Sequence, residues 1–263
     1  MIQEQAPTPY CFTREGGGFV PSGLSKNPWF GNAIAGGPIS ALTATIIEEA
    51  GFEPDFEICR VTIDIWGIVP RTHLEPKITA IRSGRQAQLH RIELFAAGKL
   101  VCQTHVLLAR HLETPIIPAS FDYPHPDTLE ENQFLIGAGM AGAIRTKGFL
   151  GKATEPGRGA VWLCMNGEVV QGKATSPFAK ACLFGDYGNG VGSSTRAEEW
   201  SFANLDITIQ FFRMPRGEWF LIDSETQGAG NGHALAQSIF ADLDGVYAKG
   251  TQTIFVAPSQ RPI

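Results

Sequence analysis

The chain has 263 residues, 43% hydrophobic and 18% charged, which is enough for one large domain or two small domains with apolar cores. Its formal net charge is −5 and its basic residues form no run, which disfavours nucleic acid and anionic membranes as partners. The five cysteines form no Cys-x-x-Cys pair and no stretch approaches 18 apolar residues, so we expect a cytoplasmic protein without disulfide bonds or a membrane span.

The first half of the chain predicts one helix followed by four strands. The segment from Gly36 to Gly51 has Pro in its first turn, is apolar on almost all sides and ends in glycine, which predicts a buried helix. The runs that follow are rich in β-branched residues and are separated by turn residues, which predicts strands at 58–69, 74–81, 88–95 and 100–108. An earlier strand at 11–20 can pair at the edge of this sheet.

The second half repeats this order after a segment rich in Pro, Gly, Asp and Glu. That segment, 111–158, predicts a linker between an N-terminal domain at 1–110 and a C-terminal domain at 159–263. A strand at 160–165 and a helix that begins at Ser176-Pro177 come next. Four more strands are expected at 202–212, 219–226, 233–240 and 246–256.

The two halves can be aligned at a shared Pro-Arg dipeptide. Pro70-Arg71 and Pro215-Arg216 each close the first strand after a helix, and they lie 145 residues apart. This offset places turns on turns to within a residue or two, which indicates two copies of one domain. In each copy an antiparallel sheet would curl round a central helix. We therefore predict an α+β protein with a double hotdog fold, in which two antiparallel sheets each wrap a central helix.

Several short motifs, in order, resemble the acyl-CoA thioesterase family with two fused hotdog domains. In the first half they are Asn27-Pro28-Trp29, Gly36-Gly37 and Arg82-Ser83-Gly84-Arg85. In the second half they are 185–190 (Gly-Asp-Tyr-Gly-Asn-Gly), 202–208 (Phe-Ala-Asn-Leu-Asp-Ile-Thr), 213–219 (Arg-Met-Pro-Arg-Gly-Glu-Trp), 242–245 (Asp-Leu-Asp-Gly) and Gln252. The resemblance covers roughly residues 10–110 and 160–257.

The resemblance implies hydrolysis of an acyl-CoA thioester by water, without a metal ion or another cofactor. It implies that an Asp, a Thr or Ser and a Gln hold the attacking water. Carried over by motif, these residues are Asp206, Thr226 and Gln252.

The repeat provides a separate argument for these three positions. The residues 145 positions earlier are all apolar, namely Val61, Ile81 and Leu107. Asp206 lies in the alternating segment 204–211, and a carboxylate shielded in a groove could act as a general base near neutral pH. The alternative is that Asp206 faces solvent on the outer side of the sheet.

The glycines that open the first helix are a candidate binding site for the substrate carbonyl. Without side chains, Gly36 and Gly37 allow close approach to unpaired N–H groups at the positive end of the helix dipole. The alternative is that these glycines only allow the helix to enter a tight core. Asp186, with Asn189, lies where the second helix gives way to a Gly-rich loop, and we interpret it as a cap or turn former.

The sequence lacks the motifs of several other enzyme classes. There is no Gly-x-Ser-x-Gly elbow and no phosphate-binding loop, and the six histidines show no metal-type pairing. Two alternatives stay open: a hotdog hydratase or dehydratase, which needs a His near the helix entrance, and a non-catalytic acyl-CoA-binding protein. We expect Arg82, Arg85 or Arg213 to contact the CoA phosphates, and we expect a homodimer or a higher homo-oligomer.

Overall fold

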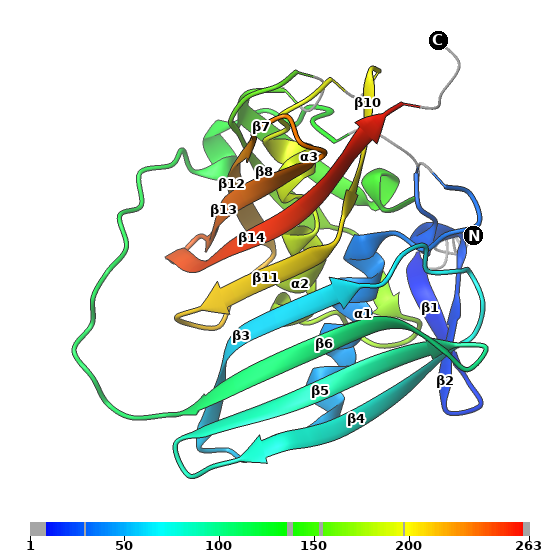
Figure 1. Cartoon of the computed structure of the whole chain (residues 1–263). Coiled ribbons are helices and arrows are strands. Elements are labelled where there is room, and N and C mark those ends of the chain that lie inside the picture. The colour runs from blue at the N-terminus through cyan, green and yellow to red at the C-terminus, as the bar shows by residue number, and fades with distance from the viewer. Residues whose placement is uncertain (1–8, 29, 136–138, 153–154, 197, 260–263) are drawn as a thin grey trace, which may run out of the picture.

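The computed structural model describes residues 9–28, 30–135, 139–152, 155–196 and 198–259 (Figure 1). In the first half, a hairpin and a short 3-10 turn precede the main helix and a four-stranded meander. The elements are β1 (Tyr10–Glu15), β2 (Gly18–Pro21), η1 (Gly23–Ser25), α1 (Gly36–Ala50), β3 (Phe56–Ile65), β4 (Leu74–Ser83), β5 (Ala87–Ala96) and β6 (Lys99–Arg110).

The second half adds a shorter helix and a second meander. Its elements are η2 (Pro126–Thr128), η3 (Gly139–Ala143), β7 (Ile144–Leu150), β8 (Gly159–Met165), β9 (Glu168–Val170), α2 (Pro177–Gly185), α3 (Gly188–Val191), β10 (Trp200–Asn204), β11 (Asp206–Phe211), β12 (Trp219–Gly228), β13 (His233–Asp242) and β14 (Gly245–Pro258). The predicted order of helices and strands is therefore confirmed, except that the single strand expected at 202–212 is two strands, β10 and β11, separated by a bend at Leu205. The expected single strand at 11–20 is instead the β1–β2 hairpin.

The strands form one continuous sheet in the order β7-β8-β12-β13-β14-β11-β3-β6-β5-β4-β2-β1-β9, with β10 paired to β14. The two halves join where β3 and β11 pair in antiparallel fashion, with Asp64 opposite Asp206. The α+β class is confirmed, but the expected pair of separate sheets is not seen. Pairing β3 with β11 gives hydrogen-bond partners to two edges that would otherwise be unpaired.

Helices α1 and α2 pack against each other on one side of this sheet, behind the strands as Figure 1 is drawn. The side chains of α1 are buried from Gly37 to Ile47 because they are almost all apolar or small. On β11, Ile207 and Ile209 point toward α2, where a side chain at Gly185 would collide with Ile209. We call this the inner face of the sheet and the opposite one the outer face.

The two helices begin differently. The N-cap residue of α1 is Ala35, which has no side chain that can cap the first turn. In α2 the Ser176 hydroxyl oxygen accepts a hydrogen bond from Ala179 N and donates one to Glu48 Oε2 near the end of α1 (2.9 Å). The N-terminus of α2 is therefore capped by a side chain, whereas that of α1 is not.

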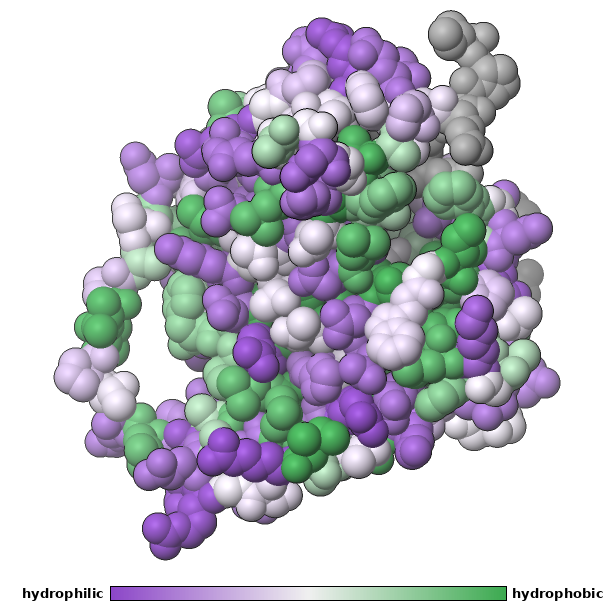
Figure 2. Space-filling model, viewed as in Figure 1, coloured by the Kyte–Doolittle hydropathy of each residue, from purple (hydrophilic) through white to green (hydrophobic). Residues whose placement is uncertain are grey.

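The segment 111–158 is only in part the irregular linker that we expected. It contains β7, which pairs with β8, and the turns η2 and η3. Gly148 and two basic residues obscure the alternation of β7, so its strand pattern is weak in the sequence. The part from 111 to 125 has no regular structure. Its first portion loops away from the body in Figure 2, with Ile116 and Ile117 each 92% exposed, whereas Tyr123 near its end donates to Asp223 Oδ2 at 2.7 Å.

Candidate active site

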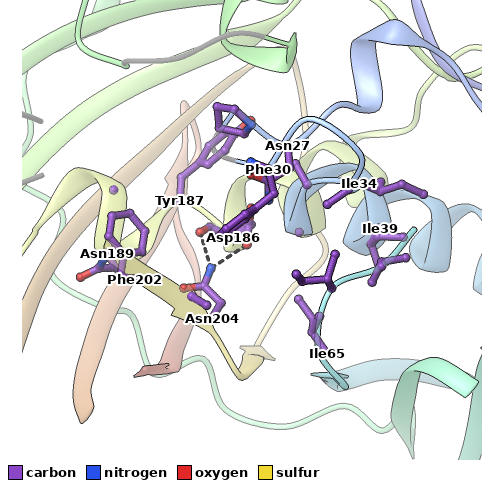
Figure 3. Close-up of a pocket in the computed structure, with 18 of the residues that line it drawn as sticks. Asn27, Phe30, Ile34, Ile39, Ile65, Asp186, Tyr187, Asn189, Phe202 and Asn204 are labelled. Atoms are coloured by element: carbon purple, nitrogen blue, oxygen red, sulfur yellow. Dashed lines mark hydrogen bonds between the residues drawn. The ribbon is translucent and has the colours of Figure 1, made fainter. Parts of the chain in front are cut away.

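A cavity of about 350 Å³ lies where α1 begins, β3 ends and α2 passes into α3. Its lining includes one carboxylate. In Figure 3, Ile39 and Ile65 lie at one end, which we call the aliphatic end although Asn27 lies near Ile34 there, and Asn189 lies at the other, which we call the amide end. The carboxylate lies between the two ends. An apolar cavity with a few polar groups is the usual form of a small-molecule site.

The carboxylate belongs to Asp186, the C-cap residue of α2. Burial raises the pKa of Asp186 to about 6, although hydrogen bonds from Asn204 and from the backbone N–H of Gly37 lower it. At pH 7 the group is therefore mostly ionised, yet basic enough to accept a proton. A carboxyl group with a raised pKa in a cavity is a candidate catalytic group.

Asn204, the last residue of β10, orients this carboxylate. Its Nδ2 donates to Asp186 Oδ1 at 2.6 Å and to the Asp186 backbone oxygen at 3.0 Å. Its Oδ1 is buried without a hydrogen-bond partner, and the residue lines the cavity. A buried acceptor without a partner is costly, so a donor bound in the cavity would satisfy it.

Gln252 on β14 fixes the backbone that carries the carboxylate. Its Nε2 donates to the backbone oxygen of Asp186 at 2.9 Å, and its Oε1 accepts from the backbone N–H of Asn189 at 2.9 Å. Gly188 lies over this amide, where an added Cβ would be 2.4 Å from Gln252 Oε1. The junction between α2 and α3 is therefore held rigidly on the inner face of the sheet.

The glycines at the start of α1 make room for the carboxylate. A Cβ at Gly36 would lie 2.2 Å from Asp186 Oδ1, and a Cβ at Gly37 would lie 3.1 Å from the Leu183 backbone oxygen. The first N–H groups of a helix have no partner within the helix, so no bond inside α1 occupies the N–H of Gly36, which lines the cavity. This terminus can stabilise negative charge on a bound oxygen.

Among the site residues predicted from the sequence, the structure therefore brings together Gly36, Gly37 and Gln252. Asp206 does not line the cavity: its Oδ1 accepts from Thr253 N at 2.9 Å and it shares the outer face with Thr208. The backbone bends at Leu205, between β10 and β11, so the alternation that we expected from 204 to 211 is interrupted.

Thr226 lies on the inner face of β12, opposite Ala236 of β13, which in turn lies opposite Gln252. Its hydroxyl is buried without a partner, but Thr226 is two strands away from Gln252 and does not line the cavity. The structure therefore places Thr226 in the same row as Gln252 without bringing the two side chains to one site.

The three predicted arginines also lie outside the cavity lining. Arg82 and Arg85 are exposed near the β4–β5 turn, at the end of the sheet where β3 begins, and the cavity lies at the other end of β3, roughly 30 Å along the strand. Arg213 is held by the buried Asp242, with Nη1 2.7 Å from Oδ2, and donates to the Gly245 backbone oxygen. Lys26 is an exposed cation that does line the cavity.

Sequence reasoning missed Asp186 and Asn204 as members of one site. The available signal in the sequence was the break of the second helix at Gly185-Asp186, and we interpreted Asp186 as a cap. Asp186 is the C-cap residue of α2, and it also lines the cavity. Trp29, part of the first motif, lies outside the described residues.

Within the described ranges, no three or more His, Cys, Asp or Glu residues gather so that they could hold a metal ion. The described helices include none that is long and apolar enough to cross a membrane. No histidine from this part of the chain lines the cavity either.

Two family models match this chain, and both describe one family. Residues 25–110 match the acyl-CoA thioesterase N-terminal domain and residues 122–256 match the acyl-CoA thioesterase C-terminal domain. The second match begins inside the segment that we expected to be a linker. A search of curated proteins found no match.

Solved structures share the fold at low sequence identity. A hot dog fold protein of unknown function from Alicyclobacillus acidocaldarius is 14% identical, with a TM-score of 0.73 and coverage of 96% of each chain. A tesB protein from Mycobacterium avium subs paratuberculosis is 15% identical, with a TM-score of 0.68 and coverage of 94% of this chain and 96% of that one. An acyl-CoA thioesterase II, TesB2, from Mycobacterium marinum is 16% identical, with a TM-score of 0.66 and coverage of 85% and 90%.

Proposed function

The chain belongs to the acyl-CoA thioesterase family, and from this premise we propose that it hydrolyses acyl-CoA thioesters with water activated by Asp186. The observation that carries the proposal is the Asp186 carboxylate, whose pKa is raised to about 6 by burial in a largely apolar cavity. Asp206, the base expected from the sequence, is the competing assignment.

The proposed reaction begins with a water molecule between Asp186 and Asn204. One hydrogen of the water would point to the carboxylate and the other to the unpartnered Asn204 Oδ1. The water oxygen forms a bond to the thioester carbon while Asp186 takes the proton. Gly36 N–H and the dipole of α1 would stabilise the charge on the carbonyl oxygen. The C–S bond then breaks and the thiolate takes the proton from Asp186.

The roles of the neighbouring residues follow from their contacts. Asn204 orients both the carboxylate and the water. Gln252 acts through the backbone of Asp186 and is a positioning residue. The aliphatic end of the cavity, with Ile39 and Ile65, would hold the acyl chain.

Free-thiol release from acyl-CoAs of different chain lengths tests the proposal. A thioesterase releases thiol in proportion to enzyme concentration and shows an optimum length. A non-catalytic acyl-CoA-binding protein would bind acyl-CoA in calorimetry without releasing thiol. A hydratase or dehydratase would change an enoyl- or hydroxyacyl-CoA without thiol release, although the cavity lining described here contains no histidine for such chemistry.

We further propose that the chain is a duplicated hotdog domain, divided at 1–110, 111–158 and 159–263, and that it works as a homodimer or a higher homo-oligomer. The bounds of β4 and β12 differ by the offset of 145 that the repeat predicts, which supports the duplication. The exposed Ile116 and Ile117 support assembly, since isoleucine is seldom left fully exposed. Sedimentation of an active sample tests it, and a monomer at micromolar concentration would contradict it.

A further inference from the structure

Asn189 carries a buried amide that nothing in the described protein satisfies. The residue is 2% exposed and lines the cavity, and its buried Nδ2 has no hydrogen-bond partner. Its backbone N–H is already taken by Gln252 Oε1 at 2.9 Å, so the residue is fixed in place. A buried donor without a partner costs stability, so it marks a place where a ligand atom should accept a hydrogen bond.

The position of this donor along the cavity indicates which part of a ligand would reach it. In Figure 3, Asn189 and Phe202 lie at one end of the residues drawn, Ile39 and Ile65 lie at the other, and Asp186 and Asn204 lie between them. If the thioester is at Asp186, its acyl chain and its thiol arm must extend in opposite directions. The aliphatic end suits the acyl chain, which leaves the amide end for the thiol arm.

The thiol arm of coenzyme A contains an amide two carbons from its sulfur. Its carbonyl oxygen is an acceptor, and the short alkyl segment before it can pack on an aromatic ring such as Phe202. Asn189 is three residues beyond Asp186, across the junction between α2 and α3. The Gln252 amide holds both backbones, because its Nε2 donates to the Asp186 oxygen and its Oε1 accepts from the Asn189 N–H, each at 2.9 Å. Both residues line the cavity, so a bound thioester at Asp186 would have Asn189 close by.

We propose that Asn189 Nδ2 donates a hydrogen bond to the first amide carbonyl of the thiol arm, and so selects thioesters whose thiol carries this amide. The inference rests on the proposed thioester hydrolysis at Asp186. It makes Asn189 a specificity-determining residue, separate from the groups that act on the reacting carbon.

The test compares three thioesters of one acyl group: the CoA thioester, the N-acetylcysteamine thioester, which keeps the first amide, and the S-ethyl thioester, which has none. Rates are divided by the hydroxide-catalysed rate of each ester to remove differences in leaving group. Asn189→Leu keeps the approximate size of the side chain but removes the donor. We expect its kcat/KM to fall about 10- to 100-fold for the first two esters and to stay within about twofold for the third.

Ser193→Ala is the matched control, because Ser193 lines the same cavity but its hydroxyl already donates to the Thr195 backbone oxygen at 2.8 Å. We expect no difference among the three esters with this variant. An equal fall of Asn189→Leu on all three esters would overturn the proposal, since the donor would then serve the reacting carbonyl or the fold. An unchanged rate on all three would overturn it too.

If Asn189→Leu does not fold, the wild-type protein still decides the question. The proposal requires the wild type to prefer the N-acetylcysteamine thioester over the S-ethyl thioester by at least about tenfold after normalisation. Equal rates would overturn it. If the wild type hydrolyses none of the three esters, the proposed function itself is refuted. Failure of the Asn189 proposal and failure of the proposed function are therefore distinguishable.

Discussion

Replacing Asp186 by Asn should abolish hydrolysis and at the same time make the protein more stable at neutral pH. The variant loses the proton acceptor, so thiol release should fall by roughly a hundredfold or more. The gain in stability follows from the raised pKa, because burial makes the ionised carboxylate unfavourable in the folded protein. A catalytic group that lowers stability is expected when function and stability make opposite demands on one site.

The size of the effect can be worked out from the pKa. Asp186 titrates at about 6 in the folded chain, against 3.8 for a free side chain. At about 1.4 kcal/mol per pH unit, ionisation lowers the free energy of unfolding by about 3 kcal/mol. Well below pH 3.8 both states bind the proton and the penalty vanishes, and it develops fully as the pH rises through 6. Asn carries no charge, so the stability difference between variant and wild type should grow by most of this amount, about 2.4 kcal/mol, between pH 4 and 7.

The assay measures urea unfolding of both proteins at pH 4, 5, 6 and 7, beside thiol release from the best acyl-CoA. Hydrogen bonds lost in the variant change its stability equally at every pH, so the trend with pH isolates the carboxylate. Asp206→Asn is the matched control, since it makes the same change on the outer face. A stability difference that does not vary with pH would refute the raised pKa. If a folded Asp186→Asn variant keeps full activity and Asp206→Asn loses it, Asp206 would be the general base and the assignment to Asp186 would be wrong.

Three further changes test other parts of the structure. Gly36→Ala should lower kcat for thiol release at least tenfold, because the added methyl group would displace the Asp186 carboxylate. Gly23→Ala is the control and should leave kcat unchanged, because the space around Gly23 is open. Lys26→Met should raise KM for acyl-CoA several-fold at low salt and less at high salt, since an exposed cation beside the cavity attracts phosphates; steady-state kinetics at two ionic strengths check this. Burial and the Asp206 carboxylate opposite on β11 raise the pKa of Asp64. Asp64→Asn should therefore increase the free energy of unfolding by up to about 1 kcal/mol at pH 7 and by less at pH 4, which urea titrations measure.

The order of the elements could be predicted because it depends on local patterns, whereas the site could not because it depends on contacts between distant residues. The apolar helix at α1 and the alternating strands are visible in single segments of the sequence. The contact between Gly36 and Asp186 joins residues 150 positions apart, and no local pattern encodes it.

The side of the sheet on which Asp206 lies could not be predicted from the sequence either. An alternating strand identifies two faces but not which residues continue on the same face after a bend. Asn204 and Asp206 are two positions apart, so an unbroken strand would place both side chains on one face. The bend at Leu205 turns Asn204 toward the cavity and leaves Asp206 outside. Gln252 contacts the backbone of Asp186 and Asn189, and its predicted part in holding the water stays a prediction.

The capped N-terminus of α2 determines how many ligands one chain can hold. In a duplicated domain, each helix terminus could in principle face an equivalent binding site. Of the two long helices, α1 leaves its N-terminus uncapped, whereas the Ser176 hydroxyl, hydrogen-bonded to Glu48, caps α2. If the chain is the duplicated domain that we propose, it would keep two copies of the scaffold but a single reaction centre, and a tight-binding substrate analogue should saturate the protein at one molecule per chain.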